Sequence, residues 1–436
     1  MKHIHHILYC LLFIAGLSSC IADTILEDPD NGQAKAENAQ VMLSLSVPES
    51  QLPSATRSIS DDSNVNSLHV LVFEGEKEDT DPKNYRLTDV IDIKDKYLNA
   101  KDKPFYIAIK ESKKVVCLSL VANAEITSPL NSTKGETLES LKFNASKLSY
   151  MPMYGEAAPF MDGLSRDVHY NDIKVSLTRA LAKIEVQYNS SQTTNEFEFL
   201  GIEILNTNDQ GYIATGQGIL SQKAIGSINI PAGGEKVVSA YVAETENNTG
   251  NKISVLVHGK YYDTEGYYRL DMIKEKENNE ILRLVRNYKY IFSLQNVNYA
   301  GRTRDDALRG EPDNKAFNAR VMTLSADESS ILDITTDDQY FLGVNSSTLQ
   351  LEDDGNICFT KLKILTNNYN EGWKIVDTPS DVTFNPGTTG GTAVSDATRK
   401  VSTVWIYIDR NQVTKDFNFY ITSGKIRKTI TVKQPK

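Results

Sequence analysis

Cys20 is the residue whose surroundings predict a definite chemical fate. Lys2 precedes an apolar run from Ile7 to Gly16, which is too short to span a bilayer because a spanning helix needs roughly 20 apolar residues. The run is followed by Leu17-Ser18-Ser19-Cys20, where a branched residue and two small residues lead to a thiol that can carry a lipid. We therefore predict a signal peptide, acylation of Cys20, and attachment to the outer membrane through that lipid. The alternative is an ordinary secretory signal with an incidental cysteine.

Side chains able to do catalysis are scattered through the rest of the sequence. His69, His169 and His258 are isolated from one another, and Cys-x-x-Cys, His-Glu-x-x-His and Gly-x-Ser-x-Gly motifs are absent. Gly387–Gly391 lacks the lysine of a phosphate-binding loop, and Glu352–Asn356 lacks the spaced oxygens and final glutamate of a calcium loop. We predict that the chain is not an enzyme and holds no metal or cofactor. An active site dispersed in the sequence is the alternative.

Charge and cysteine content further narrow the class of protein to which the chain can belong. The net charge of the chain is −10, without a basic stripe, so nucleic acid is not a predicted partner. Cys10 leaves with the signal peptide and Cys20 is acylated. The two remaining cysteines, Cys117 and Cys358, lie far apart in the sequence and between apolar neighbours. We expect both to be buried as small hydrophobic side chains, without a disulfide.

Apolar residues recur mainly at every second position, which predicts strands. The segment from Val41 to Pro48 alternates in this way, and Ile253–Tyr262 and Tyr267–Met272 are expected to form a hairpin across a turn that contains Gly266. A helix is expected at Thr137–Lys147. The predicted fold class is mostly β, with tandem β-sandwich domains of transthyretin-like or immunoglobulin-like type and one or two short helices.

The domain boundaries are predicted from where runs of strands begin and end. The polar segment 299–317 has few apolar residues and the composition of a linker. The expected order is a signal peptide at 1–19, a lipidated polar spacer at 20–40, sandwiches at 41–172 and 173–298, a linker at 299–317, and a third sandwich at 318–436.

A break in the alternation marks a candidate ligand-binding face near the C-terminus. Val404, Ile406 and Ile408 can fill a sandwich core, which leaves Trp405 and Tyr407 on the opposite face of the same strand. A strand with one wet face should be polar there. Two aromatic side chains at these positions are therefore covered by a loop or another domain, or are exposed to stack on a sugar or a partner. Trp373 is the predicted core tryptophan of this sandwich.

Short motifs spread over residues 1 to 300 give the chain a family resemblance. In their order after Cys20 they resemble the fimbrillin superfamily of Bacteroidales, which comprises the type V pilins and their minor subunits. These motifs are Ala55-Thr56-Arg57-Ser58, Val65-Asn66-Ser67-Leu68-His69-Val70-Leu71-Val72-Phe73, Val121-Ala122-Asn123-Ala124, Met151-Pro152-Met153-Tyr154-Gly155, Leu177-Thr178-Arg179-Ala180-Leu181-Ala182-Lys183-Ile184 and Arg286-Asn287-Tyr288-Lys289-Tyr290. The last quarter of the chain is similar to a BACON-type immunoglobulin-like module, on Trp373-Lys374-Ile375, Arg410-Asn411 and Thr431-Val432-Lys433-Gln434.

The resemblance implies a structural and adhesive role on the cell surface, with other fimbrial subunits as partners. Fimbrillins are exported as lipoproteins and cut after an arginine, so that the first strand leaves and a strand from a neighbour fills the groove. Arg57 followed by Ser58 is the site that this implies, and it lies in a polar stretch of small residues suited to nicking. Because a whole domain occupies the C-terminal part, a tip or accessory subunit fits better than a stalk subunit.

Two alternatives remain open from the sequence. The chain is an uncleaved fimbrial anchor if it keeps its lipid and Arg57 is only a solvated loop residue. Exposed aromatic side chains would favour the second alternative, a surface glycan-binding lipoprotein of a polysaccharide-uptake system. In a fimbrial subunit, Trp405 and Tyr407 would instead form part of an adhesive face for a glycan or host-surface ligand.

Overall fold

Strands dominate the computed structural model, as the sequence predicts. The structure describes residues 38–47, 55–56, 63–93, 104–188, 197–220, 227–248, 252–274, 280–294, 297–314, 321–325, 328, 330–331, 333–336, 340–395, 398–413 and 415–435. The predicted fold class, mostly β with short helices, is confirmed. Packed strands surround three main hydrophobic cores, and the bodies that these cores define are called the first, second and third units here.

The first unit is built from two sheets that face each other across one core. One sheet has the order β5-β1-β9, with β1 in the middle, at Phe105–Lys110, Asn38–Ser46 and His169–Ser176. The other has the order β10-β8-β6-β3-β4, at Thr178–Arg179, Met153–Glu156, Val115–Ala122, Leu68–Gly75 and Arg86–Ile93.

The helix of the first unit begins and ends earlier than the sequence pattern suggested. Helix α3 runs over Lys134–Ser140, because the Thr133 hydroxyl accepts from the Glu136 backbone and the Glu136 carboxylate accepts from the Thr133 backbone, which together cap its first turn. The rest of the predicted helix forms strand β7, Lys142–Asn144, which pairs with β13, Gln210–Tyr212, and then a 3-10 turn at Ala145–Lys147. Another 3-10 turn lies at Pro82–Asn84.

The second unit also consists of two sheets. The sheet β2-β15-β11-β20-β21 uses Ala55–Thr56, Val237–Val242, Ala182–Tyr188, Lys289–Leu294 and Val321–Leu324. The sheet β14-β12-β16-β17 uses Ser227–Pro231, Phe197–Leu205, Ser254–Tyr261 and Thr264–Asp271. A small ladder joins β18, Ile273–Lys274, to β19, Glu280–Ile281. Strand β21 lies within the segment that the sequence prediction gave to the third sandwich, yet it pairs with β20.

The predicted hairpin is present as β16 and β17, but its turn is tighter than expected. Tyr261 pairs with Thr264, so Tyr262 and Asp263 form the loop and Tyr262 takes the positive φ of 48°. Gly266 has a different role, because a Cβ on it would lie 2.6 Å from the backbone of Gly301. The glycine therefore lets the following segment pack against β17.

The segment predicted as a linker, 299–317, is folded onto β17 over its described part. Tyr267 and Arg302 form a bridge, and the Asn314 side chain bonds to both backbone groups of Asp271, at 2.8 and 3.0 Å. Helix α4, Arg304–Arg309, is fixed by two hydrogen bonds from Arg304 to the Glu203 carboxylate, at 2.8 and 2.6 Å. The hydrogen bond from Arg304 holds the pKa of Glu203 below its usual range. Polar composition here reflects ion pairing with the sheet, which explains the difference from the prediction.

The third unit is a sandwich of two sheets. The sheet β22-β23-β26-β30-β28 uses Asp333–Thr336, Phe341–Val344, Ile357–Thr366, Ser402–Asp409 and Val382–Asn385, with β25, Glu352–Asp353, beside β26. The sheet β24-β32-β31-β27-β29 uses Thr348–Gln350, Ile426–Lys433, Phe417–Ser423, Trp373–Val376 and Thr389–Gly390. A 3-10 turn follows β30 at Arg410–Gln412.

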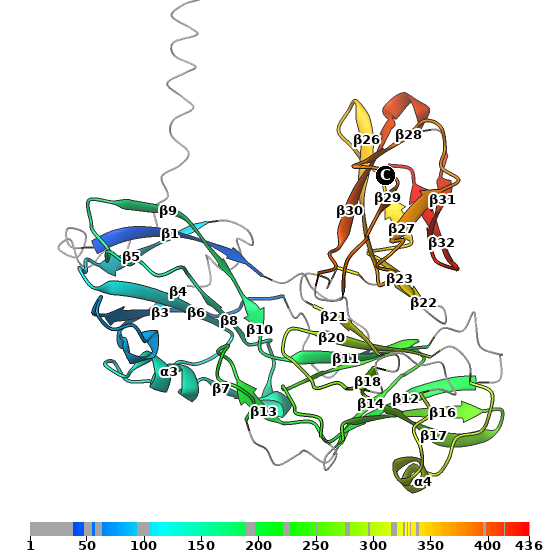
Figure 1. Ribbon diagram of the computed structural model, residues 1–436, viewed down its shortest axis with the longest axis horizontal. Helices are drawn as coiled ribbons and strands as arrows, with labels where there is room; N and C mark the ends of the chain where they lie inside the picture. The colour runs from blue at the N-terminus through cyan, green and yellow to red at the C-terminus, as the bar shows by residue number, and fades with distance from the viewer. Residues whose placement is uncertain are drawn as a thin grey trace, which may run out of the picture.

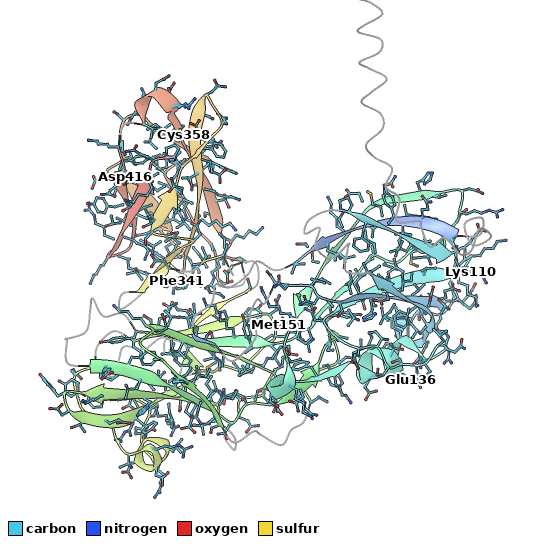
Figure 2. All side chains as sticks on the ribbon, turned by 180° about the vertical axis from the view of Figure 1, so that it is seen from behind. Lys110, Glu136, Met151, Phe341, Cys358 and Asp416 are labelled. Atoms are coloured by element: carbon cyan, nitrogen blue, oxygen red, sulfur yellow. The ribbon has the colours of Figure 1, made fainter. Side chains whose placement is uncertain are left out.

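The first and second units lie next to each other, and the third rises from the second (Figure 1). A separate apolar cluster joins Ile291 of β20 and Met322 of β21 to Phe341 of β23 and Leu365 of β26. Figure 2 shows Phe341 at the base of the third unit and Cys358 farther up inside it. No helix within the described residues is both long and apolar enough to cross a membrane.

Candidate strand-exchange site and aromatic face

Strand β1 is enclosed on both sides by strands that follow it much later in the sequence. It pairs antiparallel with β5, from Asn38 opposite Lys110 to Leu43 opposite Phe105, and parallel with β9, up to Ser46 opposite Ser176. Ala39, Val41 and Leu43 point into the core and have no exposed surface. The strand that the alternation predicted therefore fills the slot between β5 and β9 (Figure 1).

The residues just before the predicted cleavage site form a second strand in another unit. Ala55 and Thr56 form β2, which pairs parallel with Val238 and Ser239 at the edge of the second unit. Arg57 and Ser58 lie outside the described residues, as does the lipidation site Cys20. Cutting after Arg57 would thus break the covalent link of both β1 and β2 to the units that they complete.

The sheet that receives β2 carries a buried ion pair on the face turned away from the second core. The Glu185 carboxylate lies 3.0 Å from the Lys289 ammonium and 3.7 Å from that of Lys183, and all three side chains are at most 5% exposed. Gln187 donates a hydrogen bond of 2.7 Å to the same carboxylate. Burial would raise the pKa of Glu185, but the two lysines outweigh burial and hold it below its usual range. The stability of this face therefore depends on Glu185 being ionised.

The family-like motifs of the first unit meet around one asparagine. Asn123, with φ of 59°, follows β6, and its side-chain oxygen accepts from the backbone amides of Asn66 and Ser67 at 2.8 and 3.3 Å. Its amide group donates to the carbonyls of Asn64 and Met151, at 2.7 and 2.8 Å. Three separate motifs are thereby joined at the ends of β3, β6 and β8, which gives them a structural explanation.

In the third unit, Trp405 and Tyr407 lie on the face opposite the core, as the alternation predicted. Val404, Ile406 and Ile408 belong to the core cluster, whereas the two aromatic side chains are half-buried. The Trp405 and Tyr407 rings are nearly parallel, at 18°, with centroids 6.3 Å apart. Ligand binding by this pair stays a prediction.

Sequence reasoning missed the residues of β26 that lie beside this pair. Phe359 is opposite Tyr407 and Lys361 is opposite Trp405 in the ladder. The Phe359 ring lies 6.1 Å from the Trp405 ring, and the Lys361 ammonium lies 5.3 Å above the Trp405 ring. The alternation of buried Cys358 with these residues was a usable local signal, but it could not reveal which strand lies alongside.

Trp373 is buried in the third core, as predicted, and glycines explain how its indole fits. A Cβ on Gly390 or Gly391 would come within 2.8 or 2.5 Å of the indole, and one on Gly372 would lie 1.9 Å from the Gly390 carbonyl oxygen. The Gly-rich loop that might have suggested a phosphate cradle is thus packed against a tryptophan.

The remaining candidates for chemistry stay apart. His69 lies 3.6 Å from Asp92 in the first unit, and His258 stacks on Tyr267 in the second unit and contacts Glu265 at 2.6 Å. Within the described residues no group of three or more His, Cys, Asp or Glu side chains could hold a metal ion. Cys117 and Cys358 are free and buried, as the sequence predicted.

Fimbrial proteins are among the solved structures that this chain resembles. A fimbrillin from Porphyromonas gingivalis has a TM-score of 0.42 at 16% identity, covering 62% of this chain and 92% of that one. A tip fimbrial protein of the same species gives 0.40 at 14%, covering 59% and 96%. A fimbrial assembly protein from Parabacteroides distasonis gives 0.38 at 13%, covering 59% and 91%. At TM-scores below 0.5, these likenesses by themselves establish no function. No family model and no curated protein sequence matches the chain.

Proposed function

We propose that this chain is a structural and adhesive minor subunit of a cell-surface fimbria, at the tip or in an accessory position, that assembles by strand exchange. Export as a lipoprotein through Cys20 brings it to the outer membrane, and cleavage between Arg57 and Ser58 frees the segment that carries β1. A strand from a neighbouring subunit then replaces β1. The observation that carries the proposal is that β1 occupies the centre of its sheet, while its covalent link to the rest of the unit runs through Arg57.

The energetics of β1 favour replacement over an empty slot. Val41 and Leu43 have no exposed surface, and burying each such side chain contributes roughly 1.5–3 kcal/mol. Loss of β1 would also leave unpaired backbone groups on both β5 and β9. An incoming strand must therefore present an apolar residue at every second position, the smallest of them where Ala39 now lies.

The edge of the second unit that β2 now occupies gives a donated segment longer than β1 a second place to pair. Departure of β2 would expose the edge of β15 at Val238 and Ser239. By contrast, the edge of β17 is closed by the bridge from Tyr267 to Arg302 and by Asn314. A donated strand thus finds an opened edge beside β15 and a covered one beside β17.

A peptide-exchange experiment tests the proposal. The wild-type chain and Arg57→Ala are treated with an arginine-specific protease, and a labelled peptide of the sequence 38–47 is added in low urea. We expect Ser58 as a new N-terminus and uptake of the peptide by the cleaved wild type only. A peptide with aspartate in place of Val41 and Leu43 is the matched control. Equal uptake of both peptides, or none by the cleaved chain, would contradict strand exchange.

Acylation and the position in the fimbria are checked in cells. Radiolabelled palmitate should enter the wild type and not Cys20→Ala, and label in the mutant would refute lipidation at this residue. Surface protein that begins at Ser58 is expected for a polymerised subunit. A start at Cys20 alone would favour an uncleaved anchor, or the glycan-binding lipoprotein that the aromatic face around Trp405 also suits.

A further inference from the structure

The outer face of the third unit's larger sheet is covered at one end, where Leu365 of β26 belongs to the cluster that joins the second and third units. Beyond that end, the neighbouring strands β26 and β30 carry three aromatic side chains and a lysine on this face (Figure 1). We name these four residues, Phe359, Lys361, Trp405 and Tyr407, the aromatic strip. Its rings are half-buried and its lysine is exposed, whereas the residues that alternate with them fill the third core.

The side chains of this face form four rows across the strands. Glu352 and Asp409 lie in the first two rows, and Lys361 and Lys363 lie in the last two, so the face is acidic at one end and basic at the other. From the end at Ile357 towards the second unit, the rows are Ile357 with Asp409, then Glu352 with Phe359, Tyr407 and Thr383, then Lys361 with Trp405 and Asn385, and finally Lys363 with Thr403.

The charges at the two ends of the aromatic strip are available to a partner. Glu352 and Lys361 are exposed, and neither forms an ion pair with another described residue. The Lys361 ammonium lies 5.3 Å above the Trp405 ring. Asp409 is also exposed, although its carboxylate accepts a hydrogen bond of 2.8 Å from the backbone of the turn that follows. By contrast Asp353, the neighbour of Glu352, is paired within the unit, with an arginine at 2.9 Å.

This order of rows is complementary to itself when it is reversed. Two sheets pack face to face about 10 Å apart, with their strands within about 30° of each other. A two-fold axis that lies between two such faces and crosses the strands reverses the rows, while each strand stays over its own copy. Tyr407 then lies over Trp405 of the second copy, and Phe359 lies over its Lys361. Glu352 comes beside that same lysine.

We propose that the aromatic strip is the interface of a symmetric dimer of this chain. Each contact occurs twice, so the dimer gains two stacked ring pairs, two cation–ring contacts and two ion pairs. The charges also fix the orientation of the two copies. If the axis ran along the strands, the acidic rows would meet each other and the basic rows would meet each other, which like charges disfavour. The inference goes beyond the proposed strand exchange and does not depend on it.

The dimer is expected to be weak in solution, because the interface is small. Four strands of four residues cover about 250 Å² per copy, from the usual spacings of strands and residues. Such a contact belongs to the small interfaces, which bury less than about 1,200 Å² in total, so we expect a Kd between about 10 μM and 1 mM. Copies held at one cell surface are concentrated, and a weak contact is then enough to link them.

Sedimentation equilibrium of the exported chain without its lipid, residues 21–436, tests the proposal at concentrations from about 5 μM to 1 mM. The wild type should show a reversible monomer–dimer equilibrium that weakens as salt is added, because its ion pairs are exposed. Trp405→Ala should weaken it at least about tenfold, since a ring is lost from both copies. Tyr420→Ala removes a half-buried ring from the other sheet, where Arg427 covers it, and should leave the dimer unchanged. Melting temperatures verify that each variant is folded.

Two charge reversals test the symmetry of the dimer. Lys361→Glu and Glu352→Lys each place like charges next to each other at two points, so each variant alone should self-associate about tenfold more weakly than the wild type. In an equimolar mixture, the reversed charge of one variant meets the reversed charge of the other, and the two native charges meet at the second point. The mixture should therefore form a mixed dimer with a Kd close to that of the wild type.

Several results would overturn the proposal. These are a wild type that stays monomeric up to about 1 mM, equal association of Trp405→Ala and the wild type, or a mixture of the two charge reversals that associates no better than each alone. Binding of a sugar or of another fimbrial subunit that Trp405→Ala abolishes, without self-association, would assign the aromatic strip to that ligand instead.

Discussion

Leu43→Ala should weaken the hold of the first unit on β1 far more than Met42→Ala, although the two residues are neighbours. Leu43 lies between Phe105 and Ile173 with no exposed surface, whereas Met42 is half-buried on the other face of the strand. A buried Leu→Ala change costs about 2–5 kcal/mol, through lost burial and the cavity left behind. The partly exposed methionine loses less, on the order of 1 kcal/mol.

The consequence is measurable in a chain cut after Arg57, where β1 is held only by non-covalent contacts. A loss of about 2 kcal/mol or more makes retention of the cut segment roughly 30-fold weaker or worse, whereas Met42→Ala should stay within about fivefold. The segment is labelled with a dye, and its release from the cut chain is followed by gel filtration at increasing urea concentrations. The wild-type segment should stay bound in buffer.

Two results would refute this reasoning. Release of the wild-type segment without denaturant would mean that burial of Val41 and Leu43 does not hold β1. Equal release of Leu43→Ala and Met42→Ala would mean that the core-facing side of the strand has no special role. Either result would also weaken the case for strand exchange.

Two further predictions concern the second and third units. Glu185→Gln should destabilise the second unit by about 3–5 kcal/mol, because it leaves the buried Lys289 without its carboxylate. Since the folded pKa of Glu185 lies below 4.5, its contribution is present above that pH and is lost as the pH falls further, so urea unfolding should show the wild-type advantage shrinking below pH 4.5. Gly372→Ala should destabilise the third unit by more than the roughly 1–3 kcal/mol of a left-handed backbone, because its Cβ would meet the Gly390 carbonyl oxygen at 1.9 Å. Gly355→Ala, with φ of 99° and open space around its Cβ, measures the backbone cost alone by thermal unfolding, and equal losses would contradict the clash.

The sequence by itself determined those features that depend on near neighbours along the chain. Alternation placed β1, separated Trp405 and Tyr407 from the core-facing Val404, and identified the hairpin of β16 and β17, because side chains of a strand alternate between two faces. Apolar neighbours likewise predicted buried, unpaired Cys117. The helix prediction was displaced, because it followed apolar spacing alone, whereas the helix begins after the capping residue Thr133.

Only the tertiary structure decided which distant segments meet. The placement of β1 between β5 and β9, and of Lys361 over Trp405, depends on pairing between strands that local alternation does not encode. The segment 299–314 has the composition of a linker, yet Arg304 and Asn314 fold it onto the second unit through Glu203 and Asp271. A polar residue looks the same in a sequence whether it faces water or a charged partner, and the partner is supplied by the fold.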